Sequence, residues 1–328
     1  MLKTSRIPRL LCVCLLPFLS ACENLGHHEG RYTTGIDYPQ KNIQLIVPFG
    51  KGSSSDQFAS HFAGILSGEL PVKIQPINVE GAGGLLGMLA AARKAPDGYT
   101  ILQITPSHII SDVLNRSEIR LRETFDPLAL IQRDFYLLLR GTKKAGPSIH
   151  SILSRENDTY TLGGISPKGL DEMTTHALSK ALKVKLKFVP YASGHELRAA
   201  AYSGEVDFIL GKMIANLKHI RSGILKAELL LNRRRLPQIK IMAGVPASGE
   251  LGIDVDIQSW RGFAIRKGVP KHIRDYLVER IRYVYYGERY QVYLAQHLGS
   301  SYEDFIGPTA FASFWKEEYD AFSDLWQE

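Results

Sequence analysis

Apolar runs of strand length alternate with helix-like segments along most of this 328-residue chain. The run at 43–49 (IQLIVPF) is apolar apart from one glutamine, which is typical of a buried strand. The small polar segment 50–55 follows, and apolar positions three or four apart between 58 and 66 then predict a helix. The order strand, loop, helix recurs later, and this order is typical of an α/β fold with a parallel sheet.

Two groups of such units follow one another along the chain. In the first group, strands are expected at 72–79 and 99–104, each followed by a small, polar or glycine-rich turn. A long strand at 125–139 leads to the second group. That group has expected strands at 160–165, 186–189 and 206–210, and expected helices from Ser148, at 171–182 and at 197–202.

The last third of the chain is expected to return to the first group. A strand at 225–231 would make the return, and a further strand at 260–265 would follow it. Helices are expected at 270–298 and from Thr309 onward. We therefore predict two α/β domains, each with an open, mostly parallel sheet, joined by two crossing segments. The predicted bounds are 38–133 with 227–328 for domain 1 and 134–226 for domain 2.

The turns after the strands indicate an anion site. In an open parallel sheet these turns lie at one edge, where ligands bind. A helix start offers free N–H groups and a favourable dipole to a negative group, and we expect Asp56 to cap the first helix. No arginine is obvious in the turns, so we expect neutral donors to hold the ligand. The candidate ligand contacts are Ser53, Ser54, Ser55, Asp56, Gly81, Ala82, Gly83, Gly84, Thr105, Ser107, His108, Ser166, Tyr191, Ser193 and Asp207.

The charge of the chain does not indicate nucleic-acid binding. The formal net charge is +7, and the first 22 residues contribute three cations and no acid, so the remainder is only mildly basic. No cluster of lysine and arginine with interleaved aromatic residues occurs in the chain.

The N-terminus has the features of an export signal. Three cations precede the apolar segment 10–19, which is too short for a permanent membrane span. The segment 19–22 (LSAC) resembles a bacterial lipobox, so we expect cleavage before Cys22, lipid attachment to Cys22 and a tether at 23–37. The alternative is an ordinary signal peptide with a chance cysteine. A mature chain with one acylated cysteine would form no disulfide, and we expect no metal and no cofactor.

Several short motifs in order resemble one known family. They lie at 38–49, 78–87, 95–100, 189–191, 204–207 and 260–263. Together they resemble the substrate-binding proteins of tripartite tricarboxylate transporters, also called Bug receptors, over nearly the whole mature chain. The resemblance implies a two-domain, hinged periplasmic binding protein that captures a small carboxylate and delivers it to membrane transporter subunits.

The chain departs from this family at the expected site. Serines occupy 53–55, where the family usually has a glycine-rich loop, and Gly211 and Lys212 stand where an acidic or polar residue is common. Lys168 and Asp171 likewise replace small or hydroxyl residues. The identity of the carboxylate therefore stays open at this point.

Three other functions compete with transport. A binding lipoprotein could sense a carboxylate for a membrane signalling partner, and the sequence does not separate this from transport. An exported hydrolase would use Ser107, His108 and Asp56, but the chain has no G-x-S-x-G elbow. A dinucleotide site at 81–87 is disfavoured because its third glycine is one residue late. We therefore expect a binding protein with no catalytic residues.

Overall fold

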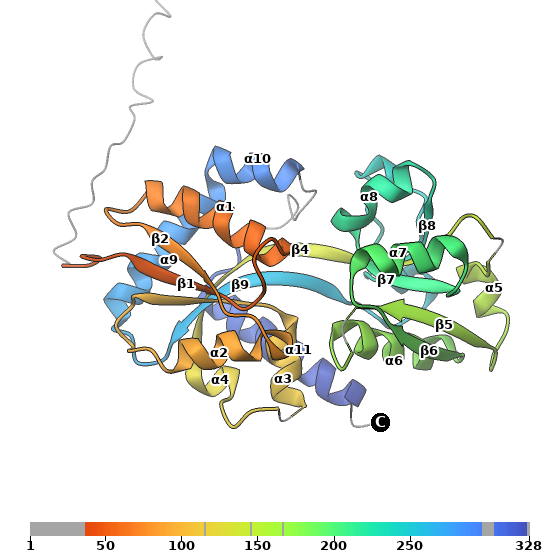
Figure 1. Cartoon of the computed structure of the whole chain (residues 1–328), viewed down its shortest axis with the longest axis horizontal. Helices are drawn as coiled ribbons and strands as arrows, with labels where there is room; N and C mark the ends of the chain where they lie inside the picture. The colour runs from red at the N-terminus through yellow and green to blue at the C-terminus, as the bar shows by residue number, and fades with distance from the viewer. Residues whose placement is uncertain (1–36, 115, 145, 166, 297–304, 327–328) are drawn as a thin grey trace, which may run out of the picture. The chain divides into compact units, whose positions relative to one another are not determined.

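A computed structural model describes residues 37–114, 116–144, 146–165, 167–296 and 305–326. Its strands run in the order β2-β1-β3-β9-β4-β7-β5-β6, and β8 pairs with β4 beside this path (Figure 1). The predicted signal segment, Cys22, the tether up to residue 36 and Ser166 lie outside the described residues.

The first group of elements forms one end of this strand order. The strands β1 (Ile43–Val47), β2 (Ile74–Asn78) and β3 (Thr100–Ile104) pair in parallel, as predicted. The segments that follow these strands contain α1 (Ser54–Gly68), η1 (Ala82–Gly84), α2 (Leu85–Ala92), α3 (Pro106–Val113) and α4 (Leu121–Thr124). The sequence did not predict α3, because its first residues, Thr105 to His108, were interpreted as a turn alone.

The second group repeats this arrangement. The strands β5 (Thr159–Gly164), β6 (Lys185–Pro190) and β7 (Phe208–Lys212) also pair in parallel. The helices of this group are α5 (Ile149–Leu153), α6 (Leu170–Leu182), α7 (Gly194–Ser203) and α8 (Met213–Arg221).

Two long strands connect the groups. The first part of β4 (Phe125–Gly141) pairs antiparallel with β9 (Gln258–Arg266), which also pairs with β3. The later part of β4 pairs with β7 and with β8 (Leu225–Leu230). The return strand predicted at 225–231 therefore stays beside the second group, because β8 forms its ladder with residues 137–141 of β4. The chain returns through β9, after the short helices η2 (Lys240–Met242) and η3 (Ser248–Leu251).

The C-terminal helices pack aromatic residues against both faces of the first group. The helix predicted at 270–298 is two helices, α9 (Lys271–Tyr286) and α10 (Glu288–Gln296), separated at Gly287. On one side Phe62 lies 5.1 Å from Phe263 and 5.1 Å from Tyr290, measured between ring centroids. On the other side α11 (Pro308–Trp326) places Phe311 5.6 Å from the Trp260 ring.

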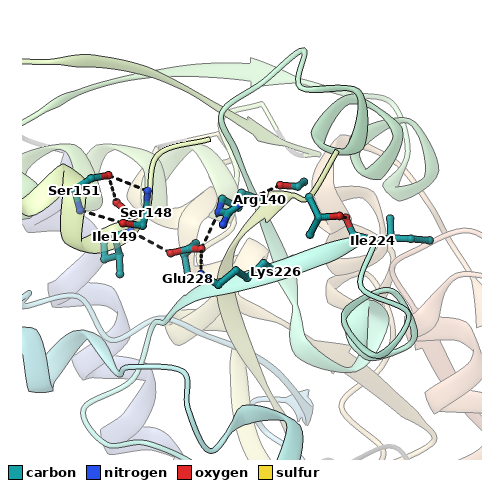
Figure 2. Close-up of polar contacts among 9 residues, drawn as sticks. Arg140, Ser148, Ile149, Ser151, Ile224, Lys226 and Glu228 are labelled. Atoms are coloured by element: carbon teal, nitrogen blue, oxygen red, sulfur yellow. Dashed lines mark hydrogen bonds and ion pairs between the residues drawn. The ribbon is translucent and has the colours of Figure 1, made fainter. Parts of the chain in front are cut away.

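A buried ion pair ties the second group to β4 (Figure 2). The Glu228 side chain is 3% exposed, and its Oε1 accepts hydrogen bonds from Arg140 Nε at 2.8 Å and Lys226 Nζ at 2.9 Å. Its Oε2 accepts from the backbone N–H of Ile149 at 3.2 Å, at the start of α5. Both carboxylate oxygens thus have partners, as a buried charge requires.

Candidate functional site

The turns that follow β1, β2 and β3 meet at one edge of the sheet. Asn78, the last residue of β2, donates from Nδ2 to the Phe49 carbonyl and to Asp56 Oδ1, each at 2.9 Å. A Cβ added to Gly84 would lie 3.2 Å from the His108 ring, so the second turn touches the start of α3. The helix starts of α1, η1 and α3 are thereby brought together, as the sequence predicted for parallel strands.

The cap of α1 is Ser53 and not Asp56, which corrects the sequence-based expectation. Ser53 Oγ accepts from the Asp56 N–H at 3.2 Å. The Asp56 carboxylate accepts from the Gly52 N–H at 2.8 Å as well as from Asn78, and these bonds hold its pKa below the usual range. Asp56 therefore shapes the loop, while Ser54 is exposed and Ser55 is buried at the helix start.

The turn after β2 has an unusual backbone. Gly81, Ala82, Gly83 and Gly84 all have positive φ, at 134°, 48°, 68° and 102°. Positive φ is easiest for glycine, which has no Cβ. The glycines predicted as ligand contacts thus form a compact turn that leads directly into α2.

His108 has a structural role in the cap of α3. Its side chain is 1% exposed, and Nδ1 accepts from the N–H of Thr105 at 3.1 Å. Burial lowers the pKa of His108 to about 4, so the ring is neutral at physiological pH. Thr105 is itself buried as the N-cap, and Ser107 is half-buried in the first turn of α3.

An arginine reaches the first turn, contrary to the expectation of neutral donors alone. Arg261 of β9 donates from Nη2 to Ser54 Oγ at 2.9 Å and from Nη1 to Gln132 Oε1 at 2.7 Å. Its side chain is 5% exposed, and its guanidinium lies 5.7 Å from the Phe58 ring centroid. The sequence signal was present, because Arg261 follows Trp260 in one of the family-like motifs. The contact with Ser54 could not be predicted, because the two residues are 207 positions apart in the sequence.

A second cation lies where β7 ends. Lys212 interacts electrostatically with Arg261, Asp134 and Asp171, and burial, followed by the charge of Arg261, lowers its pKa to about 8. Burial raises the pKa of Asp134 to about 6 and also raises that of Asp171. Asp134, Asp171, Lys212 and Arg261 come from β4, α6, β7 and β9. The charges of the other three therefore affect the pKa of Lys212.

The predicted contacts of the second group are not all at this edge. Asp207 precedes β7, and its Oδ2 accepts from the N–H and the hydroxyl of Thr161, both at 2.8 Å. It lies at the edge opposite the carboxyl ends of the parallel strands, away from the other candidate contacts. Tyr191 follows β6 and donates to Glu205 Oε1 at 2.7 Å, while Ser193 caps α7.

The two groups also touch near these turns. Arg116, just after α3, donates from Nη2 to the carbonyl oxygen of Lys168, which precedes α6. A Cβ on Gly83 would lie 4.0 Å from Arg116 Nη1, so this arginine borders the second turn as well.

The described residues hold neither a metal-ligand cluster nor a membrane span. Within those ranges no three His, Cys, Asp or Glu side chains are grouped to hold a metal ion. No helix there combines the length and apolar character needed to cross a bilayer.

The sequence profile of the "Tripartite tricarboxylate transporter family receptor" matches residues 69–297. The chain belongs to this receptor family. Protein BugT of Bordetella pertussis is 27% identical over 247 residues, which cover 72% of this chain and 74% of BugT. The family predicted from the short motifs is thereby confirmed.

Solved structures of the family share the fold. A TctC solute-binding protein from Polaromonas superposes with a TM-score of 0.75 at 21% identity, covering 88% of this chain and 98% of that one. MatC from Rhodopseudomonas palustris, solved with bound malate, has a TM-score of 0.70 at 22% identity and covers 88% and 99% of the two chains. The predicted two-domain periplasmic binding protein fold is therefore confirmed.

Proposed function

We propose that this receptor binds a small organic anion with at least one carboxylate and delivers it to the membrane subunits of a tripartite transporter. The observation that carries the proposal is the meeting of three helix starts with the Arg261 guanidinium beside Ser54. Backbone N–H groups, hydroxyls and one fixed cation at a single edge match the acceptor oxygens of a carboxylate. The malate bound to MatC supports this ligand class.

A hydrolase function has little support in the geometry. His108 would have to act as the base, but its Nδ1 is occupied by the Thr105 N–H and its ring is buried. Asp56, the acid of the supposed triad, is hydrogen-bonded to Gly52 and Asn78. We therefore propose binding without catalysis, cofactor or metal.

The ligand class is tested by isothermal titration calorimetry of the mature protein. The panel contains mono-, di- and tricarboxylates, amino acids, aromatic acids and neutral sugars. We expect at least one carboxylate to bind, and we expect Ser54→Glu to abolish that binding because its carboxylate would pair with Arg261. Ser54→Ala is the matched control and should weaken binding less than Ser54→Glu, because it adds no charge beside Arg261. Tight binding of a neutral sugar, with no response to any carboxylate, would overturn the proposal.

We further propose that the protein is held at the cell envelope by lipid on Cys22. The support is the sequence at 19–22, which follows a basic and apolar segment. Mass spectrometry of the membrane fraction should show a mature chain that begins at diacylated Cys22. An uncleaved chain with an unmodified Cys22 would show that the proposal is wrong.

A further inference from the structure

Lys212 occupies a position that favours contact with a ligand. It is the last residue of β7, where it pairs with Tyr136 of β4, and α8 begins at the next residue. The carboxyl end of a parallel strand is where the binding turns of such sheets lie. Lys212 therefore belongs to the binding edge of the second group, as Ser54 does for the first.

The ammonium of Lys212 is open to a ligand acceptor. Lys212 is half-buried, and no hydrogen bond or ion pair joins its ammonium to another of the described residues. An ammonium carries three donors, so an acceptor oxygen of a ligand could bind it. Burial and the charge of Arg261 lower the pKa of Lys212 to about 8.

The charged groups near Lys212 do not supply the missing acceptor. The partners of Asp171 are other groups, because Oδ1 accepts from the Tyr136 hydroxyl at 2.5 Å and Oδ2 from the Ile165 N–H at 2.7 Å. Asp134 Oδ1 accepts from the N–H of Ile214 at 3.4 Å, and neither carboxylate forms an ion pair with Lys212 among the described residues.

Arg261 adds a second unsatisfied donor to this place. Its Nε is buried and has no hydrogen-bond partner in the described chain, while its two other nitrogens contact Gln132 and Ser54. Donors from β7 and β9 thus lack acceptors close to the helix starts. A ligand oxygen would satisfy both, and an anionic group would also offset the two positive charges.

We propose that Lys212 is a specificity-determining residue whose ammonium, with Arg261 beside it, receives a second anionic group of the ligand. The receptor then selects dicarboxylates over monocarboxylates of the same length. This inference rests on the proposed function, because the first carboxylate is the one held at the starts of α1, η1 and α3.

Matched pairs of acids test the proposal by calorimetry at pH 7. The pairs are succinate with butyrate, glutarate with pentanoate and adipate with hexanoate, which differ in one terminal group. In at least one pair the diacid should bind about tenfold or more tightly than the monoacid, as expected for a hydrogen bond between charged groups. Equal affinity within every pair would overturn the inference.

Variants then assign the preference to one residue. Lys212→Met keeps a similar side-chain length without the charge, so it should weaken diacid binding about tenfold and change monoacid binding little. Lys218→Met is the matched control, because Lys218 is an exposed lysine on the adjoining helix α8 and its loss should change neither. Lys212→Arg should retain the preference. If Lys212→Met kept the full preference for the diacid, Lys212 would not be the selecting residue.

A titration of the native protein avoids any folding defect of a variant. Arg261, Asp134, Asp171 and Tyr136 face Lys212 from β9, β4 and α6. Burial raises the pKa of Asp134 to about 6, raises the pKa of Asp171 and of Tyr136, and lowers that of Arg261. The diacid preference should fall as pH rises past the Lys212 pKa of about 8, because the ammonium then loses its charge. A preference that stayed constant from pH 7 to 10 would contradict the role of Lys212. If no acid of any pair bound, or if binding were equal within every pair, this inference alone would fail. The proposed function would fail only if no carboxylate of the wider panel bound.

Discussion

Arg261 donates a hydrogen bond from Nη2 to Ser54 Oγ at 2.9 Å, across 207 positions of sequence. This bond joins the strand β9, which runs between the two groups of elements, to the first turn of α1. The turn is thus held by a charged side chain in addition to its own backbone bonds. The same guanidinium influences the pKa of Lys212, so one residue affects both proposed halves of the ligand site.

We expect substitution of Arg261 to weaken carboxylate binding. Arg261→Met should lower affinity about tenfold or more, because a charge-assisted donor is lost at the α1 start. Arg261→Lys keeps the charge but not the two-way contact with Ser54 and Gln132, so its effect should be smaller. Calorimetry with the tightest carboxylate would measure both. An unchanged affinity for a correctly folded Arg261→Met protein would contradict this prediction.

The buried ion pair of Figure 2 should be important for stability. Glu228→Gln leaves Arg140 without its counter-charge, and breaking a buried pair in this way costs about 3–5 kcal/mol. Lys226→Gln removes the other partner of Glu228, but Lys226 is 54% exposed, so the cost should be below about 1 kcal/mol. Urea unfolding of both variants would give the two free energies. If both variants lost the same free energy of unfolding, the greater exposure of Lys226 would not make its contact weaker than that of Arg140.

Glu318 should make stability depend on pH. The residue lies on α11, and its Oε2 accepts from Trp260 Nε1 at 2.8 Å. Burial raises its pKa from 4.5 to about 7, so the folded protein favours the protonated form. Its contribution is therefore fully present below pH 4.5 and is lost as pH rises through about 7.

The comparison of native protein with Glu318→Gln isolates this effect. Glutamine keeps an acceptor for Trp260 and cannot ionise, so melting temperatures between pH 5 and 8 should fall less steeply in the variant. Part of the slope should remain, because the pKa values of Asp112 and Asp134 are also raised, to about 6. Identical slopes in both proteins would rule out Glu318 as a source.

We also expect ligand binding to bring the two predicted domains together. The first part of β4 pairs with β9 and the later part with β7 and β8, so a bend within β4 and β9 would change the angle between the groups. Small-angle scattering with and without saturating carboxylate should show a smaller radius of gyration in the bound form. An unchanged radius with a tightly bound ligand would argue against closure.

The sequence predicted the strands well because their apolar runs are short and bounded by glycine or proline. It missed α3, although Thr105 followed by Pro106 is a favourable helix start. It also missed α8, in which only Met213, Asn216 and Leu217 are buried. Short helices with few apolar residues give little periodic signal, and tertiary packing decides whether they form.

The candidate site was predicted in part. The turns at 53–56, 81–84 and 105–108 lie together because parallel strands place their ends at one edge. The contact of Arg261 with Ser54 was not predicted, since no local pattern connects residues so far apart. Asp207 was placed inside the predicted strand 206–210, but it precedes β7, at the edge opposite the carboxyl ends of the parallel strands.

The ends of the chain segment 142–224 lie next to each other. Gly141 of β4 pairs with Leu225 of β8, and the N–H of Thr142 donates to the Ile224 carbonyl at 3.2 Å. The segment is therefore joined to the remainder of the protein at two neighbouring points, one on β4 and one on β8. Exchange of this segment between receptors of the family would need two adjoining splice points. Such an exchange would transfer Lys212 to another receptor without Arg261. The two cations could therefore be acquired independently of each other.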